Sequence, residues 1–269
     1  MRRILNLFKE TYSAKDVIWT LALSDFKNKY VGSYFGLVWA IIQSTVIFVL
    51  YWVVFEFFLQ VPPGELSVPF ALWLMAGFVP WMFFSDALVN VTGTFQSYAF
   101  VVKKMTFKIS VLPFAKILST FFMSCILNVV LIVVFAINGK LVTIHLADIL
   151  YYNICMFYLL TGLSFALSSI NVFFRDTAQI IGILVQFGTW ITPILWNYKS
   201  IPKVEPFLWV FKLNPMFYIV DGYRSALIDG SWFFERPLLS LEFWLVSTVI
   251  FFLGASIYVK LRPHFADVL

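Results

Sequence analysis

The chain has 269 residues, of which 61% are hydrophobic and only 12% are charged, against roughly a quarter charged in an ordinary soluble domain. This composition excludes a soluble globular protein, because long apolar runs with unsatisfied backbone groups are stable only as membrane helices. The net charge of +5 and the pI of about 9.1 would suit nucleic acid. The basic residues lie in loops between apolar runs, however, so we expect no nucleic-acid partner.

Residues 1–34 precede the first apolar run and predict a cytoplasmic tail that ends in an amphipathic helix. The sequence S-A-K-D at 13–16 has the form of a capping box, so we expect a helix over about 14–29. Three apolar residues share one face of it: Ile18, Ala22 and Phe26. This pattern is typical of a helix that lies in the membrane interface. A plain basic flank that fixes the topology is the alternative.

Six long apolar runs follow in chain order, at 35–59, 68–98, 114–137, 149–170, 180–196 and 243–259. A bilayer core about 30 Å thick takes roughly 20 helical residues. The runs therefore predict an all-α integral membrane protein, with six transmembrane helices in one domain over 35–260 and a cytoplasmic tail over 261–269. If the N-terminus is cytoplasmic, most Lys and Arg residues lie inside. The positive-inside rule then places both termini in the cytoplasm.

Asp86 stands within the second apolar run. A carboxylate inside the membrane is a candidate functional residue by default. We expect no membrane-embedded Lys or Arg to pair with it. We therefore favour a hydrogen-bonding role near Asn90 and Thr94, or a place on a watery interior face, over a proton relay.

Small and polar residues recur along the fifth run at spacings of three and four: Gln179, Gly182, Gln186, Thr189 and Pro193. These spacings place them on one face of a helix. Lipid does not favour two glutamines, so the stripe is predicted to meet protein or an aqueous path. Packing of small residues between helices and the lining of a conduit both remain open.

The first run carries a similar stripe of Gly32, Gly36, Trp39 and Gln43. Aromatic residues lie at its mouth: Tyr34, Phe35 and Trp39. Aromatic rings stack on sugar rings, so these residues are candidates for contact with a glycan. An ordinary aromatic belt at the membrane interface is the alternative.

The segment 206–230 is broken by Asn-Pro at 214–215 and by Asp221, which leaves apolar pieces too short to span. We expect two short re-entrant helices that dip into the outer leaflet between the fifth and sixth spans. Arg224 lies in this segment. We expect it to pair with an acid such as Asp221 or Asp229, and contact with a substrate phosphate is the alternative.

No catalytic or metal site is expected in this chain. His145 and His264 are predicted on opposite sides of the membrane, so they cannot form one site. The sequence contains no G-x-x-x-x-G-K-[ST] phosphate loop, so any use of ATP requires another polypeptide. Cys125 and Cys155 fall inside predicted spans and are expected to be free apolar fillers.

Seven segments, in order, resemble signatures of ABC-2 type permeases that export polysaccharides. They are D-F-K-N-K-Y-V-G-S-Y-F-G-L-V-W at 25–39, G-F-V-P-W at 77–81, V-K-K-M at 102–105, V-L-P at 111–113, F-R-D at 174–176, T-P-I-L-W at 192–196 and N-P-M at 214–216. Residues 214–224 are similar to the membrane subunit of wall teichoic acid exporters. Permeases that export O-antigen or capsule are its relatives.

The resemblance implies a homodimer in the bacterial plasma membrane, bound to two copies of a separate ATPase that uses ATP and Mg²⁺. This chain itself needs no cofactor. Lipid-linked glycan, foremost wall teichoic acid, would pass outward between the first and fifth helices. The implied ATPase-coupling residues are Asp25, Lys27, Lys103, Lys104, Arg175 and Asp176. The implied path residues are Tyr34, Phe35, Trp39, Gln43, Gln179, Gln186 and Thr189. The implied outer gate residues are Asn214, Pro215, Asp221 and Arg224.

Three other functions remain open. Within the family, the cargo could be O-antigen or capsular polysaccharide. Outside it, a membrane-embedded glycosyl- or acyltransferase would need convergent acids or a His base at one membrane face, which the spans do not supply. A stand-alone channel or secondary carrier would function without an ATPase.

Overall fold

The computed structural model describes residues 11, 13–30, 36–58, 67–104, 109–139, 145–198, 201 and 206–269, without the side chains of 37, 40, 101, 103, 104 and 266. All regular structure in these residues is helical. The α-helices are α2 Lys15–Tyr30, α3 Leu37–Val53, α4 Phe70–Thr92, α5 Thr94–Ser97, α6 Ala99–Lys104, α7 Val111–Ile137, α8 Leu146–Phe173, α9 Thr177–Ile191, α10 Leu208–Lys212, α11 Pro215–Arg224, α12 Pro237–Leu261 and α13 Phe265–Val268. Short π-helical or 3₁₀ turns cover Val54–Phe58, Ser225–Asp229, Phe233–Glu235 and Arg262–His264.

Five helical stretches are long and apolar enough to span a membrane: Ile41–Phe58, Phe70–Thr92, Val111–Ile137, Leu146–Phe173 and Pro237–His264. They confirm five of the six predicted spans. The sixth prediction, 180–196, falls largely on α9, which has 15 residues and is therefore about 22 Å long at 1.5 Å per residue. The second predicted run was too long, because α4 ends at Thr92 and Gly93 separates it from the short helix α5.

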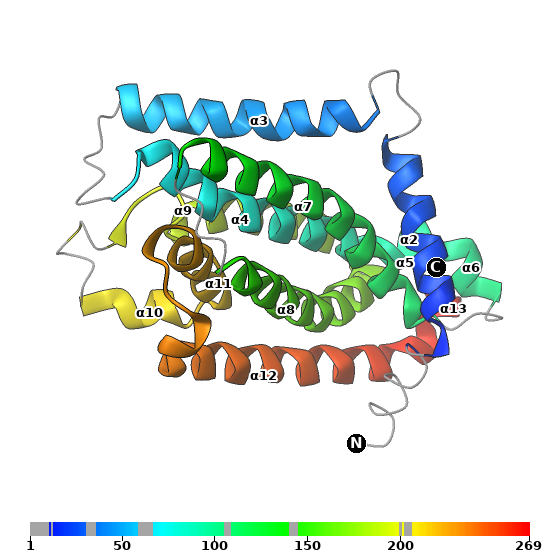
Figure 1. Ribbon diagram of the computed structural model, residues 1–269. Coiled ribbons are helices and arrows are strands. Elements are labelled where there is room, and N and C mark those ends of the chain that lie inside the picture. Colours follow the sequence, from blue (N-terminus) through cyan, green and yellow to red (C-terminus); the bar gives the residue numbers. More distant parts are fainter. Residues whose placement is uncertain are drawn as a thin grey trace.

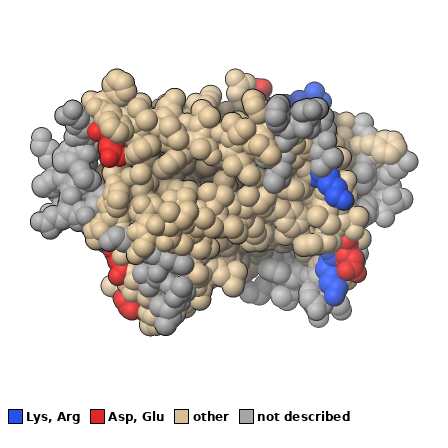
Figure 2. Space-filling model, turned by 45° about the horizontal axis from the view of Figure 1, so that its top comes forward, with Lys and Arg blue, Asp and Glu red and all other residues tan. Residues whose placement is uncertain are grey.

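Charged residues are distributed as a membrane protein requires. Figure 2 shows a broad middle without Lys, Arg, Asp or Glu, and the charged residues lie toward its two ends. In Figure 1, α5, α6 and α13 lie at one end of the long helices, and α10 and α11 lie toward the other. The face seen in Figure 2 is thus a mostly apolar band between two polar ends, as contact with hydrocarbon requires.

The predicted N-terminal helix is confirmed as α2, and it packs across α7. Ala22 on its inner face is fully buried, while Trp19 and Phe26 make edge-to-face contacts with Phe122. The side chain of Asp25 forms an ion pair with Lys116 at 3.0 Å. Helix α2 is therefore fixed to the bundle by aromatic packing and by charge.

Helix α8 lies between α7 and α12 in Figure 1 and crosses α12 at unusually close range. A Cβ atom on Gly162 would lie 2.7 Å from the Phe251 backbone, and one on Gly254 would overlap the Gly162 carbonyl oxygen. Small residues permit such close approach between membrane helices, where packing rather than hydrophobic burial drives association. The two glycines therefore determine how near α12 lies to α8.

We predict that Gly254→Leu separates α8 from α12 and destabilises the protein by about 1–3 kcal/mol, the usual cost of overpacking. Thermal unfolding of the purified protein in detergent measures the effect. Gly93→Ala is the matched control, because no atom lies within 4 Å of the added methyl group. Equal unfolding temperatures for the two variants would mean that the crossing tolerates a larger separation.

Candidate functional site

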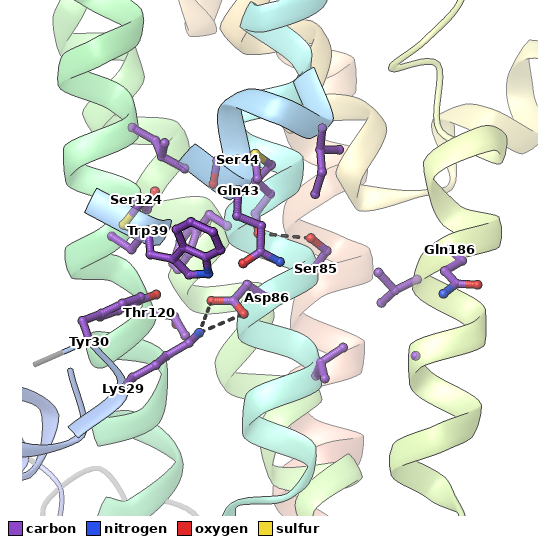
Figure 3. A pocket seen from close by; sticks show the side chains of 18 of the residues that line it. Lys29, Tyr30, Trp39, Gln43, Ser44, Ser85, Asp86, Thr120, Ser124 and Gln186 are labelled. Atoms are coloured by element: carbon purple, nitrogen blue, oxygen red, sulfur yellow. Dashed lines mark hydrogen bonds and ion pairs between the residues drawn. The ribbon is translucent and has the colours of Figure 1, made fainter. Parts of the chain in front are cut away.

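A cavity of about 570 Å³ lies among α2, α3, α4, α7 and α9, and Figure 3 shows its walls. Its polar lining is Lys29, Tyr30, Trp39, Gln43, Ser44, Ser85, Asp86, Thr120, Ser124 and Gln186. Apolar side chains complete it: Ile47, Met82, Phe83, Val89, Met123, Leu127 and Val185. Its volume lies within the usual range for a ligand-binding cavity, and its lining is more polar than most.

The charged part of the cavity is an ion pair between α2 and α4. The Lys29 ammonium lies 3.1 and 3.0 Å from the two carboxylate oxygens of Asp86, and the two side chains are 40% and 45% exposed. Asn90, one turn further along α4, donates to the same carboxylate at 2.8 Å. Asp86 is thus held in place by its own helix, and Lys29 reaches it from another element.

Burial lowers the pKa of Lys29, but the neighbouring Asp86 carboxylate and Tyr30 together raise it by more, so the net pKa lies above the ordinary lysine value. Lys29 is therefore protonated at neutral pH. Because its pKa is raised on folding, the stability that the pair contributes is present at neutral pH and is lost only as the pH rises through that pKa.

The sequence predicted no membrane-embedded Lys or Arg as a partner of Asp86, and it did not identify the partner that Asp86 has. Its partner is Lys29 of the interfacial helix rather than a residue of another span. The predicted hydrogen bond with Asn90 is confirmed, whereas no described contact joins Thr94 to Asp86. Sequence patterns describe the faces of single helices, so they could not show that α2 ends beside Asp86 in the second half of α4.

Hydroxyl groups on α4 and α7 present acceptors to the cavity. Ser85 donates to the Met82 carbonyl at 3.1 Å, and Thr120 donates to the Ile117 carbonyl at 2.8 Å. Because each hydroxyl hydrogen is used within its own helix, the oxygen keeps lone pairs for a ligand. A chain of sugar hydroxyls is a suitable donor for such a wall.

Helix α3 supplies the aromatic wall. Trp39 is 58% exposed, and Figure 3 shows Trp39 and Gln43 on the side of α4 that carries Asp86. Gly36, just before α3, adopts a φ of +50°, a conformation that glycine accepts readily. Two predicted path residues, Tyr34 and Phe35, lie outside the described residues.

Helix α9 forms the opposite wall, and the structure divides its predicted stripe. Gly182 and Gln186 line the cavity, and Gln179 is exposed nearer the start of the helix. Thr189 instead is buried and accepts a hydrogen bond from the Trp81 indole at 2.9 Å. The first part of the stripe therefore faces open space, and the second part packs against α4 of the same chain.

The residues expected to couple to an ATPase differ in their surroundings. Asp25 is bound within the chain, to Lys116 at 3.0 Å and to the Tyr98 hydroxyl. Lys27 is exposed, as are Arg175 and Asp176 in the turn between α8 and α9. The backbones of Lys103 and Lys104 end α6, and their side chains lie outside the described residues.

The predicted outer segment forms α10 and α11, with Asn214 as the N-cap of α11 and Pro215 in its first turn. The expected pairing of Arg224 with an acid was wrong. Its guanidinium donates to the carbonyls of Pro193 and Ile194 at 2.6 and 2.7 Å.

Asp221 is already paired with Arg236 and accepts a hydrogen bond from Tyr198 at 3.2 Å. Sequence reasoning did not single out Arg236. It lies at the N-cap of α12, 15 residues after the carboxylate that it binds, and the Arg-Pro dipeptide at 236–237 was the only local signal of a helix start.

The family model described as "ABC-2 type transporter" matches residues 16–228. Two curated proteins named O-antigen export system permease protein RfbA, both from Klebsiella pneumoniae, are 25% identical over 256 residues and 24% identical over 258, each covering 94% of this chain and 95% of the relative. A protein of the same name from Myxococcus xanthus is 23% identical over 266 residues, or 98% of this chain and 99% of that protein.

Proposed function

This chain belongs to the ABC-2 type transporter family and is a multi-pass protein of the bacterial inner membrane, and from that premise we propose that it exports a lipid-linked polysaccharide. The three relatives described above, named as O-antigen export permeases, match it along nearly its whole length. The family implies a partner ABC ATPase, which would bind and hydrolyse ATP with Mg²⁺. This chain would supply the membrane path.

We further propose a topology with six crossings and both termini in the cytoplasm. Helix α9, continued by the irregular segment 192–198, would complete the sixth crossing. Helices α10 and α11 would then dip into the outer leaflet. With this topology α4 runs inward, and Asp86 lies six residues before its end at Thr92, or about 9 Å. The cavity would therefore lie in the cytoplasmic half of the membrane.

The observation that carries the proposal is the composition of the cavity wall at this depth. Trp39 offers an aromatic face, Gln43 and Gln186 offer amides, and several hydroxyl oxygens are free to accept. Each group makes a single weak contact, so a sugar polymer could exchange one contact for the next as it moves. A hydrocarbon substrate would not favour this wall, because burial of its polar groups costs free energy.

The cargo we propose first is O-antigen-type polysaccharide on a lipid carrier, because the relatives are named as O-antigen export permeases. Wall teichoic acid remains a second candidate, supported by the resemblance of residues 214–224 to teichoic acid exporters. In either case we propose a homodimer with the exposed faces of α3 and α9 toward the conduit. To distinguish the two cargoes, the protein is reconstituted with the ATPase and with one or the other lipid-linked polymer. If neither polymer is transferred in the presence of ATP, the export proposal is rejected.

We predict that reversing the charge of Lys103 and Lys104 to Glu weakens assembly with the ATPase or uncouples ATP hydrolysis from export. Both residues end α6, which we place on the cytoplasmic side, where a soluble partner docks. Charges at the rim of an interface act mainly through the association rate and its dependence on salt. Co-purification at two salt concentrations measures the effect.

Lys212→Glu is the matched control, because α10 lies on the opposite side in this topology. Unchanged assembly and unchanged export by the Lys103 and Lys104 variant would remove these residues from the docking surface.

A further inference from the structure

Arg224 is buried in a cage of backbone carbonyls. Its side chain is 4% exposed, and besides the bonds to Pro193 and Ile194 it donates to the Trp73 carbonyl at 3.4 Å. The guanidinium carbon lies 3.4 Å from the centroid of the Trp73 ring. A buried cation without an acid partner is costly unless hydrogen bonds and an aromatic face compensate it. Three carbonyl oxygens and one aromatic ring therefore match the planar guanidinium group of arginine.

One face of α4 receives both the arginine and the end of α9. It carries Trp73, Gly77 and Trp81 on successive turns. Gly77 leaves room for the guanidinium, since a Cβ atom there would lie 2.6 Å from Arg224 Nη2. Trp81 covers Gly188, where a Cβ atom would lie 2.7 Å from its ring, and donates to Thr189. The same helix face thus fixes Arg224 and the last turn of α9.

This seam between α4 and α9 leads directly into the cavity. Ser85 lies one turn beyond Trp81 on α4, and Gln186 lies just before Thr189 on α9; both line the cavity. From Gln186 to the end of α9 at Ile191 the helix advances about 7.5 Å, and Pro193 follows two residues later. The arginine therefore holds one end of a short rigid element whose other end is a cavity wall.

Two further contacts join the segment after α9 to α11. Asn214 donates to Thr192 at 2.9 Å, and Tyr198 donates to Asp221 at 3.2 Å. These two hydrogen bonds hold the segment after α9 to α11 on both sides of Pro193 and Ile194. Arg224 in addition contacts Trp73 of α4.

We propose that Arg224 is a positioning residue for transport. It sets the distance of the α9 wall from α4, so that a movement of α11 changes the width of the cavity. The residue touches no substrate and acts through Pro193, Ile194 and Trp73. This inference rests on the proposed export function and adds a link between the outer helices and the cavity.

A single-cysteine reporter tests this role. Gln186→Cys is introduced together with Cys125→Ser, which removes the exposed native thiol and leaves the buried Cys155. Two quantities are measured on the ATPase-bound complex: the rate of modification at 186 by a small aqueous thiol reagent, and the ATP consumed per glycan exported. Arg224→Lys keeps the charge but loses the fork that bridges two carbonyls. We expect it to assemble, to change the modification rate several-fold, and to consume more ATP per glycan.

Gly77→Ala is the second variant, because it keeps Arg224 and pushes only the end of its side chain. Gly93→Ala, at the end of the same helix, is the control with open space around the added methyl group. We expect Gly77→Ala to reproduce the effects of Arg224→Lys and Gly93→Ala to behave as the parent.

Parental reactivity and coupling in both the Arg224 and Gly77 variants would overturn the proposal. The proposal would also be overturned if export fell only in proportion to thermal stability, while the ATP consumed per glycan and the modification rate at 186 stayed unchanged. If the protein without any substitution neither binds the ATPase nor exports glycan, the export function fails instead. The reactivity at 186 then still tests Arg224 on the permease alone.

Discussion

Replacing Lys29 with Met lowers glycan export about tenfold or more, because it removes the charge that pairs with the Asp86 carboxylate at the wall of the cavity. The remaining described donor to this carboxylate is Asn90, which supplies no charge. Asp86→Leu removes the charged partner of Lys29 instead, and we expect the same loss of export. Export by vesicles that contain the ATPase-bound complex measures both variants.

The double variant Lys29→Met with Asp86→Leu separates stability from transport. An ion pair whose members are 40% and 45% exposed contributes little to stability, and the double variant leaves neither charge unpaired, so we expect normal folding and ATPase binding. Export remains low, because the cavity has lost its charged wall. Full recovery of export in the double variant would show that the pair serves only to fasten α2 to α4.

Gly182→Trp is expected to abolish export while the protein folds normally. Gly182 lines the cavity, and a Cβ atom there meets nothing within 4 Å. The indole can therefore enter the open space without displacing the helix. ATP hydrolysis and glycan export by the purified complex are measured together.

Two controls accompany this obstruction. Gly182→Ala adds only a methyl group to open space and should export normally. Val249→Trp places the same indole on α12, at a residue that is 58% exposed and does not line the cavity. Normal export by Gly182→Trp, or equal losses in the two Trp variants, would mean that glycan does not pass this wall.

The spans could be predicted from sequence, because a long apolar run leaves a helix as the only way to satisfy its backbone in lipid. The N-terminal helix α2 was located to within one residue at each end from a different signal, because its capping box and its basic last turn are local features of the sequence. The end of α4 was missed, because the apolar run continues through Gly93 into α5 although the helix does not.

The contacts between helices could not be predicted in the same way. Lys29 was counted only as a topology signal, and Arg236 as one of several loop charges, because their partners lie 57 and 15 residues away. The stripe on α9 was correctly seen as polar. Its division between Gln186 and Thr189 depends on where Trp81 of α4 meets it, which helical periodicity does not encode.

A photoreactive residue in place of Gln186 tests most directly whether glycan passes through this cavity. The matched position is Val249, which is 58% exposed on α12 and does not line the cavity. During ATP turnover by the complex, the proposal predicts covalent adducts of glycan at 186 that disappear without ATPase or polymer, and few adducts at 249. Active export without adducts at 186, or with equal adducts at both positions, would contradict it.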